Sequence, residues 1–341
     1  MNILVSGGAG FIGSHTVVEL INEGHHPVIV DDFSNSEEDV IDRLNEITGK
    51  KITSYKGSCN DLAFLNSVFE KESIDGVIHF AASKAVGESV ENPVKYYQNN
   101  VGSLLVMIEA MRVAKCKKLV FSSSCTVYGE PDVVPVTETT PRKPANSPYG
   151  NTKTICEDIL RDIQVSGEDF QFIALRYFNP VGAHESALIG ELPKGIPSNL
   201  IPYITQTAIG IREKLVVFGD DYDTEDGTNI RDFIHVVDLA KAHVAAFEFL
   251  KSKSTGFYDV FNIGTGEGYS VLQLIQTFEK VNNLKLNYNI GPRRAGDTVK
   301  IYGDVTKAKE VLGWQTQLSL EDAMRDAWKW EKALKSKNTQ S

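Results

Sequence analysis

Residues 2–13 read Asn2-Ile3-Leu4-Val5-Ser6-Gly7-Gly8-Ala9-Gly10-Phe11-Ile12-Gly13, in which an apolar run leads into a glycine-rich loop. The run from Ile3 to Val5 is typical of a buried parallel strand, and residues 14–23 are expected to form a helix. Glycines between a strand and a helix let the backbone approach a pyrophosphate, which the helix N-terminus also favours. The spacing is Gly-x-x-Gly-x-x-Gly, and taken alone this loop could also be a tight turn.

An acidic residue at the end of the next strand supports dinucleotide binding. The strand Val28-Ile29-Val30 ends at Asp31, about 18 residues past Gly13, where a carboxylate would hold a ribose 2′-hydroxyl. Asp32 follows, at a position where an NADP enzyme tends to carry arginine. The sequence therefore predicts NAD as the cofactor.

Strand and helix patterns then alternate along the chain. We expect strands near 52–55, 77–80, 118–122 and 172–176, and helices near 37–47, 61–72, 93–114 and 150–165. This order predicts an α/β fold with a doubly wound, parallel, Rossmann-type sheet. Ligands on such a sheet bind at the carboxyl ends of the strands, which directs attention to Phe80-Ala81-Ala82-Ser83-Lys84, Ser122-Ser123-Ser124 and Arg176-Tyr177-Phe178-Asn179.

Tyr149 and Lys153 form a candidate catalytic pair. On a helix they lie at i and i+4 on one face, where an ammonium favours the phenolate. A tyrosine acting as a base near neutrality needs its pKa lowered by roughly three units, or about 4 kcal/mol, and a bound cationic nicotinamide could supply part of this. Ser124 would sit over the same end of the sheet and could hydrogen-bond the tyrosine or a substrate hydroxyl. The alternatives are two unrelated helical residues and a serine that caps backbone.

The character of the sequence changes after Asn179. Residues 180–202 contain four prolines and little periodicity, which indicates a boundary. We expect residues 1–180, joined by part of 230–262, to form an NAD-binding domain. Residues 181–341 would form a smaller, mixed α/β substrate-binding domain. Its predicted elements are a strand at 215–219 and helices near 237–250, 270–281, 306–312 and 319–334, the second and fourth capped by Ser270 and Ser319.

Charged and glycine-rich segments in this second half allow several interpretations. Arg231 and the pair Arg293-Arg294 are candidates for pyrophosphate binding, with ordinary ion pairing as the alternative. The acidic loop 220–226 lacks the glycine and glutamate of a calcium loop, so we interpret it as solvated. The segment 264–268 lacks the Gly-Lys-Ser/Thr ending of a phosphate loop and is expected to make a turn. No metal site is predicted, because the seven histidines do not cluster.

Composition sets the class of the protein. A chain of 341 residues with 42% hydrophobic content can bury a substantial core, and its net charge of -10 argues against nucleic-acid or membrane partners. The four cysteines match neither a disulfide framework nor a zinc motif. There is no basic, apolar leader and no long apolar run, so we expect a soluble, cytoplasmic protein.

Long motifs in a fixed order give the sequence a specific resemblance. It resembles the UDP-glucose 4-epimerase family of extended short-chain dehydrogenase/reductases over essentially the whole chain. The motifs that carry the resemblance are Gly7-Gly8-Ala9-Gly10-Phe11-Ile12-Gly13-Ser14-His15, His79-Phe80-Ala81-Ala82-Ser83-Lys84-Ala85-Val86-Gly87-Glu88-Ser89, Ser147-Pro148-Tyr149-Gly150 with Lys153, Leu175-Arg176-Tyr177-Phe178-Asn179-Pro180-Val181-Gly182-Ala183-His184 and Thr224-Glu225-Asp226-Gly227-Thr228.

The resemblance implies roles for individual residues. Tyr149 would be the base, Lys153 would hold the nicotinamide ribose and lower the tyrosine pKa, and Ser124 would hydrogen-bond the sugar hydroxyl. These three would also line the NAD site, together with Gly7, Gly10, Phe11, Ile12, Gly13, Asp31, Asp32, Asn35, Ser36, Ser58, Phe80, Ala81, Lys84, Asn99 and Phe178. The UDP-sugar would be held by Asn179, Asn199, Leu200, Val216, Phe218, Arg231, Arg294, Asp297 and Ile301. The family pairs helices equivalent to 93–114 and 150–165, so a homodimer is expected.

Two positions depart from the family pattern. Ser58 stands where relatives commonly carry an aspartate at the adenine, which would weaken one contact without changing the cofactor. Ile301 falls where the family usually has either a bulky tyrosine or a small residue that limits the size of the sugar. The range of sugars accepted is therefore left open.

The implied activity is a reversible, NAD-dependent epimerisation at C4 of UDP-glucose or UDP-galactose, through a transient 4-keto sugar. One alternative is an epimerase that also accepts UDP-N-acetylglucosamine and UDP-N-acetylgalactosamine. Another is a nucleotide-sugar 4,6-dehydratase, which commonly has an Asp-Glu pair where this chain has Cys125-Thr126. A dinucleotide sensor without activity is disfavoured by the presence of Ser124, Tyr149 and Lys153 together.

Overall fold

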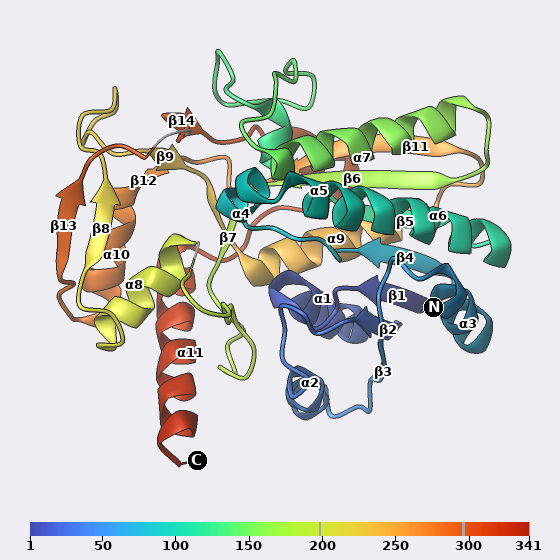
Figure 1. The fold of residues 1–341 in the computed structure, drawn as a ribbon, viewed down its shortest axis with the longest axis horizontal. Coiled ribbons are helices and arrows are strands. Elements are labelled where there is room, and N and C mark those ends of the chain that lie inside the picture. Colours follow the sequence, from blue (N-terminus) through green and yellow to red (C-terminus); the bar gives the residue numbers. More distant parts are fainter. Residues whose placement is uncertain (198, 295–296, 341) are drawn as a thin grey trace.

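The computed structural model describes residues 1–197, 199–294 and 297–340. Its central element is a sheet of seven parallel strands in the order β11-β6-β5-β4-β1-β2-β3 (Figure 1). The strands are β1 (Asn2–Ser6), β2 (His26–Asp31), β3 (Thr53–Lys56), β4 (Gly76–His79), β5 (Lys118–Ser122), β6 (Gln171–Tyr177) and β11 (Phe257–Ile263). The order reverses between β1 and β4, which is where such sheets bind their ligands.

Helices cover both faces of this sheet, because its strands are apolar on both sides. Ile3 and Val5 pack toward one layer, made of α1 (Phe11–Asn22), α2 (Val40–Thr48) and α9 (Val236–Lys251). Leu4, between them, packs toward the other layer, made of α3 (Leu62–Glu72), α6 (Gly102–Ala114) and α7 (Pro148–Val165). The predicted doubly wound α/β fold is confirmed.

The helix predicted at 93–114 is present over this range, but its middle turn is π-helical rather than α-helical. Following the short helix α4 (Val86–Glu91), it starts as α5 (Pro93–Tyr96), widens into a π-helical turn at Tyr97–Val101 and continues as α6. Within that turn the buried Asn100 accepts a hydrogen bond from the Ser83 nitrogen at 2.8 Å and donates to Thr152 Oγ1 at 3.1 Å. This side chain ties the end of β4 to α7.

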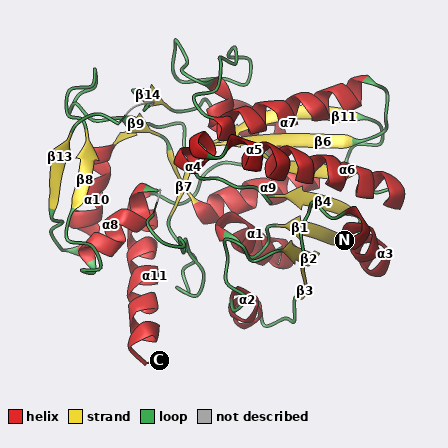
Figure 2. Ribbon diagram, viewed as in Figure 1, coloured by secondary structure: helices red, strands yellow, loops and turns green. Residues whose placement is uncertain are grey.

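The remaining elements form a smaller unit beside the sheet (Figures 1 and 2). Strands β8 (Leu215–Phe218) and β13 (Tyr288–Gly291) pair in parallel, and β12 (Tyr269–Ser270), β9 (Ile230–Arg231) and β14 (Lys300–Ile301) form a second small sheet. The core of this smaller unit includes Ile204, Leu274 and Phe278, and its helices are α8 (Leu200–Ala208), α10 (Val271–Asn282) and α11 (Leu320–Gln340). The π-helical turn Ala308–Leu312 packs instead against α9 and β11 of the larger unit. Ser270 caps α10 as predicted, in a reciprocal arrangement with Gln273.

Two connections join the units. The parallel pair β7 (Asn179–Val181) and β10 (Phe233–His235) lies directly between them. The second connection is the long loop 129–147, drawn as loop in Figure 2, in which Val136 forms an isolated bridge with Gly303, just after β14. In the described ranges, no helix combines the length and apolarity needed to cross a membrane.

Candidate active site

The glycine loop after β1 is packed as closely as a dinucleotide cradle requires. Gly7 has φ +70°, and a Cβ there would lie 3.0 Å from the Ala81 nitrogen in the loop after β4. A Cβ on Gly13 would lie 2.2 Å from the Gly7 carbonyl oxygen, so only glycine lets the start of α1 approach this loop. The backbone at the reversal point of the sheet is thus open to a pyrophosphate.

Asp31 lies at the end of β2 and faces this loop. One carboxylate oxygen accepts from the Ala9 nitrogen at 3.0 Å, and the other accepts from Phe33 nitrogen at 2.9 Å and from Ser36 Oγ at 3.0 Å. Burial raises the pKa of Asp31, while these hydrogen bonds oppose the rise. Asp32 accepts from the Ser34 nitrogen at 2.8 Å and orders the turn that contains Asn35. These residues fit the ribose and pyrophosphate of NAD.

The other predicted cofactor residues lie around the same edge. Ser58 Oγ accepts from the Asn60 nitrogen at 3.1 Å, and Asn60 in turn donates to Asn99 at 3.2 Å. Phe80 packs its ring against His243 of α9, with centroids 4.6 Å apart, so it offers the edge its backbone rather than its side chain. Lys84 Nζ pairs with a carboxylate oxygen of Glu191 at 2.9 Å.

Ser124, Tyr149 and Lys153 meet at the carboxyl end of β5. Ser147 caps α7 by accepting from the Gly150 nitrogen at 3.2 Å, which places Tyr149 in the first turn. Tyr149 is 8% exposed and is hydrogen-bonded by Ser124. Lys153 Nζ donates to the Ser122 carbonyl at 2.7 Å and lies 5.9 Å from the centre of the Tyr149 ring. The structure therefore brings the predicted catalytic residues together.

The electrostatics of this pair differ from the expectation for the working enzyme. Burial raises the pKa of Tyr149 well above 10, with Tyr177 adding to the rise and the Ser124 hydrogen bond opposing it. Burial also lowers the pKa of Lys153 to about 8. The chain alone thus favours the neutral phenol, because removing both groups from water penalises their charged forms.

A buried ionic network fixes α7 against the sheet behind the site. Glu157 of α7 accepts from Ser123 Oγ at 2.6 Å and from Arg176 of β6 at 2.7 Å. Arg176 also donates to the Tyr128 hydroxyl at 3.1 Å. Since Ser123 precedes Ser124 and Glu157 lies one turn beyond Lys153, this network sets the spacing of the catalytic side chains.

Cationic residues of the smaller unit form the facing side of the site. Arg231 is half-buried beside Asp297, Arg294 and Cys125, and burial lowers the pKa of its guanidinium. Arg294 pairs with Asp297 at 2.7 Å and lies over the ring of Phe218, 5.6 Å from its centre. Because Cys125 directly follows Ser124, Arg231 lies next to the catalytic end of β5.

The remaining predicted substrate residues lie in three places. Val216 is on β8 with Phe218 and contacts the β13 backbone, where a Cβ on Gly291 would be 2.8 Å from it. Asn179 donates to the Asp232 carbonyl at 3.0 Å, which holds β7 beside β10. Asn199 precedes Leu200, the first residue of α8, and donates to Glu191 at 2.6 Å.

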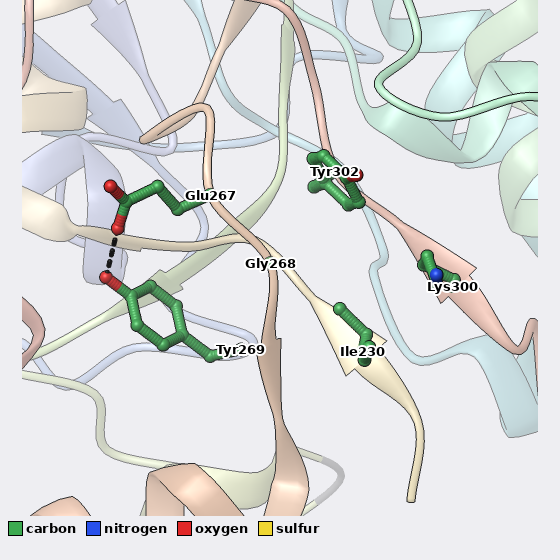
Figure 3. Close-up of a pocket in the computed structure, with 6 residues that line it drawn as sticks. All are labelled: Ile230, Glu267, Gly268, Tyr269, Lys300 and Tyr302. Atoms are coloured by element: carbon green, nitrogen blue, oxygen red, sulfur yellow. Dashed lines mark hydrogen bonds between the residues drawn. The ribbon is translucent and has the colours of Figure 1, made fainter. Parts of the chain in front are cut away.

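Ile301 is buried against Phe178 and Cys125, in a small cluster of its own. Its strand neighbour Lys300 instead lines a cavity of about 390 Å³, together with Ile230, Glu267, Gly268, Tyr269 and Tyr302. Figure 3 shows Glu267 hydrogen-bonded to Tyr269, and Lys300 and Tyr302 across the strand from them. Because successive strand residues point to opposite faces, Arg231 and Ile301 lie on the side of Cys125 and the candidate catalytic residues, and this cavity lies on the other side.

The segment 264–268 forms a turn, as expected. The buried Asp232 accepts from the Thr265 and Gly266 nitrogens at 2.8 Å and 3.2 Å. Burial raises the pKa of Asp232 to about 6. Among the described residues, no group of three or more histidine, cysteine, aspartate or glutamate side chains could hold a metal ion.

Two residues near the site were given no individual role from the sequence. Ser122 Oγ donates to the Tyr177 hydroxyl at 3.0 Å, and Tyr177 lies near Tyr149. Glu191 accepts from both Lys84 and Asn199. It stands in an irregular segment, so no periodicity could have identified it.

The fold and the whole chain match known proteins. Residues 4–327 match the family model for GDP-mannose 4,6 dehydratase. The chain is 52% identical over 328 residues to a UDP-glucose 4-epimerase of Neisseria meningitidis, covering 96% of each sequence.

Solved structures give the same result. A UDP-glucose 4-epimerase from Stenotrophomonas maltophila with bound NAD and formylated UDP-arabinopyranose matches with a TM-score of 0.96, at 46% identity over 99% of each chain. One from Bifidobacterium longum in complex with NAD+ and UDP matches with a TM-score of 0.93, at 47% identity over 98% of each chain. Because this similarity extends over nearly the whole chain, the chain belongs to the UDP-glucose 4-epimerase family of extended short-chain dehydrogenase/reductases.

Proposed function

We propose that the protein is an NAD-dependent isomerase that interconverts UDP-glucose and UDP-galactose by inverting the configuration at C4. The observation that carries this proposal is the meeting of Ser124, Tyr149 and Lys153 at the sheet end that also holds the glycine loop. That arrangement can remove a hydroxyl proton beside a bound dinucleotide.

NAD would be held by the loop from Gly7 to Gly13, by Asp31 and by the residues around Ser58, Asn99 and Lys84. When bound, NAD supplies the acceptor and donor of the C4 hydride. The chain's part is to keep the dinucleotide in place. The packing of Gly13 against Gly7 and the hydrogen bonds that orient Asp31 support this role.

Tyr149 carries out the proton transfer in this proposal. In its phenolate form, its oxygen takes the proton of the sugar 4-hydroxyl, which Ser124 orients by a hydrogen bond, and becomes a phenol; it later returns this proton to the C4 oxygen once the sugar has turned. Lys153, fixed by the Ser122 carbonyl, supplies a nearby positive charge that favours the phenolate. Between these two events the sugar is a 4-ketose.

The UDP moiety would stay bound while the sugar turns. Arg231 is half-buried and offers its charge to a pyrophosphate, and Arg294 lies on the ring of Phe218 beside it. Asn179, Asn199, Leu200 and Val216 complete this side of the site in the proposal. Anchoring UDP lets the sugar rotate about its bond to the phosphate and present its other face.

Ile301 would set the range of sugars. It is buried beside Phe178 and Cys125 and faces the catalytic residues. Isoleucine is smaller than tyrosine but stiff at χ1, so a 2-acetamido group would pass slowly. UDP-glucose and UDP-galactose are therefore the proposed main substrates, with N-acetylated sugars slower.

The chain lacks the acidic residues that a 4,6-dehydratase commonly uses to eliminate water. Elimination of water needs an acid and a base after Ser124, and the chain carries Cys125 and Thr126 there. Burial raises the pKa of the Cys125 thiol to about 12, so it cannot act as that base near neutral pH.

The organisation of the protein follows from the same proposal. Residues 1–180, with part of 230–262, would bind NAD, and residues 181–341 would bind the UDP-sugar; the pairing of β11 with β6 supports the first assignment. Exposed Val94 and Leu105, 66% and 50% exposed on α5 and α6, support a homodimer through this helical face. Four free, buried cysteines suit the reducing cytoplasm.

The proposal is tested by incubating the purified protein with UDP-galactose and, separately, with UDP-N-acetylgalactosamine, without adding NAD. UDP-glucose should form rapidly from the first. A protein that needs stoichiometric free NAD would instead be an ordinary dehydrogenase, and a protein that binds NAD without any turnover would be a sensor.

A further inference from the structure

We propose that Glu191 is a positioning residue that links the cofactor side of the site to the UDP side. One of its carboxylate oxygens, Oε1, accepts from Lys84 Nζ at 2.9 Å and from Asn199 Nδ2 at 2.6 Å. The inference rests on the proposed function, because that function places Lys84 with NAD and Asn199 with the UDP-sugar. A single atom thereby joins residues that are 115 positions apart in the sequence, from 84 to 199.

The backbone of Glu191 is fixed. Its carbonyl accepts from Trp330 Nε1 of α11 at 3.0 Å. The preceding Gly190 bridges to Ala183, and a Cβ on Gly190 would lie 2.5 Å from the Trp330 ring. Only glycine allows this contact, so the segment cannot shift away from α11 without losing its packing.

The side chain of Glu191 is nearly buried, so its carboxylate depends on the hydrogen bonds from its two donors, Lys84 and Asn199. The side chain is 10% exposed, whereas that of Lys84 is 45% exposed. An ion pair with a lysine so exposed stabilises little by itself. A carboxylate withdrawn from water, however, needs its hydrogen bonds, so it holds Lys84 and Asn199 in one geometry.

A second residue of the segment that contains Glu191 also contacts the predicted cofactor side of the site. Lys194 Nζ donates to the Phe33 carbonyl at 3.0 Å and lies 3.7 Å from a Glu37 carboxylate oxygen. Phe33 itself donates to Asp31, the predicted ribose ligand. Residues on both sides of the ligands thus share one support, and ordering either end lowers the entropy cost of ordering the other.

The consequence is a measurable linkage between UDP and NAD. Exchange of bound NAD for isotope-labelled NAD should be slowed by saturating UDP in the parent protein, by about fivefold or more. In Glu191→Ala the effect of UDP on this exchange should fall below about twofold, and the affinity for UDP, measured by calorimetry, should fall by about tenfold. Glu191→Gln, which keeps one acceptor but not the charge, should lie between the two.

Glu185→Gln is the matched control, because Glu185 is an exposed carboxylate of the same segment. It should leave UDP affinity and NAD exchange at the parent values. The inference is overturned if NAD exchange in the parent does not respond to UDP, or if both Glu191 variants keep the parent's response. Should Glu191→Ala fail to fold, the Gln variant decides. Neither measurement involves turnover, so a protein that passes both and does not epimerise would contradict only the proposed function.

Discussion

The ammonium of Lys153 lies one helical turn from Tyr149 and 5.9 Å from the centre of its ring, while donating to the Ser122 carbonyl. The ammonium is thus held by the sheet, close to the tyrosine ring. Burial lowers the pKa of Lys153 to about 8. In the proposed mechanism, Tyr149 supplies the base and Lys153 a fixed positive charge beside it.

The first prediction concerns that base. Tyr149→Phe removes a single hydroxyl from a buried ring, so turnover should fall by about a hundredfold to ten-thousandfold because proton transfer is lost. NAD content and UDP affinity should stay at the parent values. Tyr55→Phe, which removes a hydroxyl bonded to Glu72 far from the site, is the control and should be fully active. Near-normal turnover of Tyr149→Phe would show that another group takes the proton.

The second prediction compares Arg231 with Arg293 by their effect on the affinity for UDP. Arg231→Gln removes a half-buried charge that faces the site, so the affinity for UDP should fall by about tenfold to a hundredfold, as expected for lost charge-assisted hydrogen bonds. Arg293→Gln is the comparison, because Arg293 is engaged with Asp221 at 2.6 Å and lies over the Tyr222 ring. Calorimetric titration with UDP measures both. Equal losses in the two variants would contradict the placement of the pyrophosphate.

The third prediction rests on the volume of residue 301. Ile301→Tyr should suppress activity on N-acetylated sugars and spare the plain hexoses, and Ile301→Ser should raise it, because residue 301 packs beside Phe178 and Cys125. The measurement is the ratio of kcat/KM for UDP-galactose to that for UDP-N-acetylgalactosamine. If both variants keep the parent's ratio, residue 301 does not limit the sugar.

The fourth prediction concerns stability in acid. Burial lowers the pKa of His15 and of His79 to about 3 and that of His243 to about 4, from an unfolded value of 6.5. Between pH 6.5 and about 4 the unfolded chain therefore binds protons that the folded chain does not. The free energy of unfolding should fall as the pH is lowered through this window, by up to about 1.4 kcal/mol per pH unit for each histidine.

Urea unfolding at several pH values measures that slope. His243→Gln should reduce the slope of unfolding free energy against pH by the contribution of about one bound proton, since the Nε2 atom of His243 is buried without a partner. His26→Gln, at an exposed position, is the control. A parent protein whose stability is the same at pH 4.5 and pH 6.5 would contradict this account of the buried histidines.

The sequence predicted the elements of the sheet better than the details around it. The strand expected at 118–122 is β5, because central parallel strands are apolar on both faces and therefore stand out. The helix expected at 37–47 begins only at Val40, because a turn at residues 38–39 precedes it. The C-terminal helix runs on to Gln340, beyond the predicted end at 334, where no proline or glycine stops it.

In the candidate site, too, some features could be predicted from the sequence and others could not. Motifs indicated Ser124, Tyr149 and Lys153, since their chemistry is visible in residue type and spacing. The rise in the pKa of Tyr149 could not be read from them, because it arises from burial that only the assembled fold creates. Glu191 could not be found either, because its partners Lys84 and Asn199 come close to it only through tertiary packing.

The most direct test of the proposed chemistry follows the hydrogen at C4. UDP-galactose carrying deuterium at C4 is converted by the purified protein in ordinary water, without added NAD, and the UDP-glucose formed is analysed by NMR. If the hydrogen leaves C4 as a hydride and returns to the same carbon inside a closed site, the product keeps its deuterium at C4. Product with ordinary hydrogen at C4 would show exchange with solvent and would contradict epimerisation by transient oxidation.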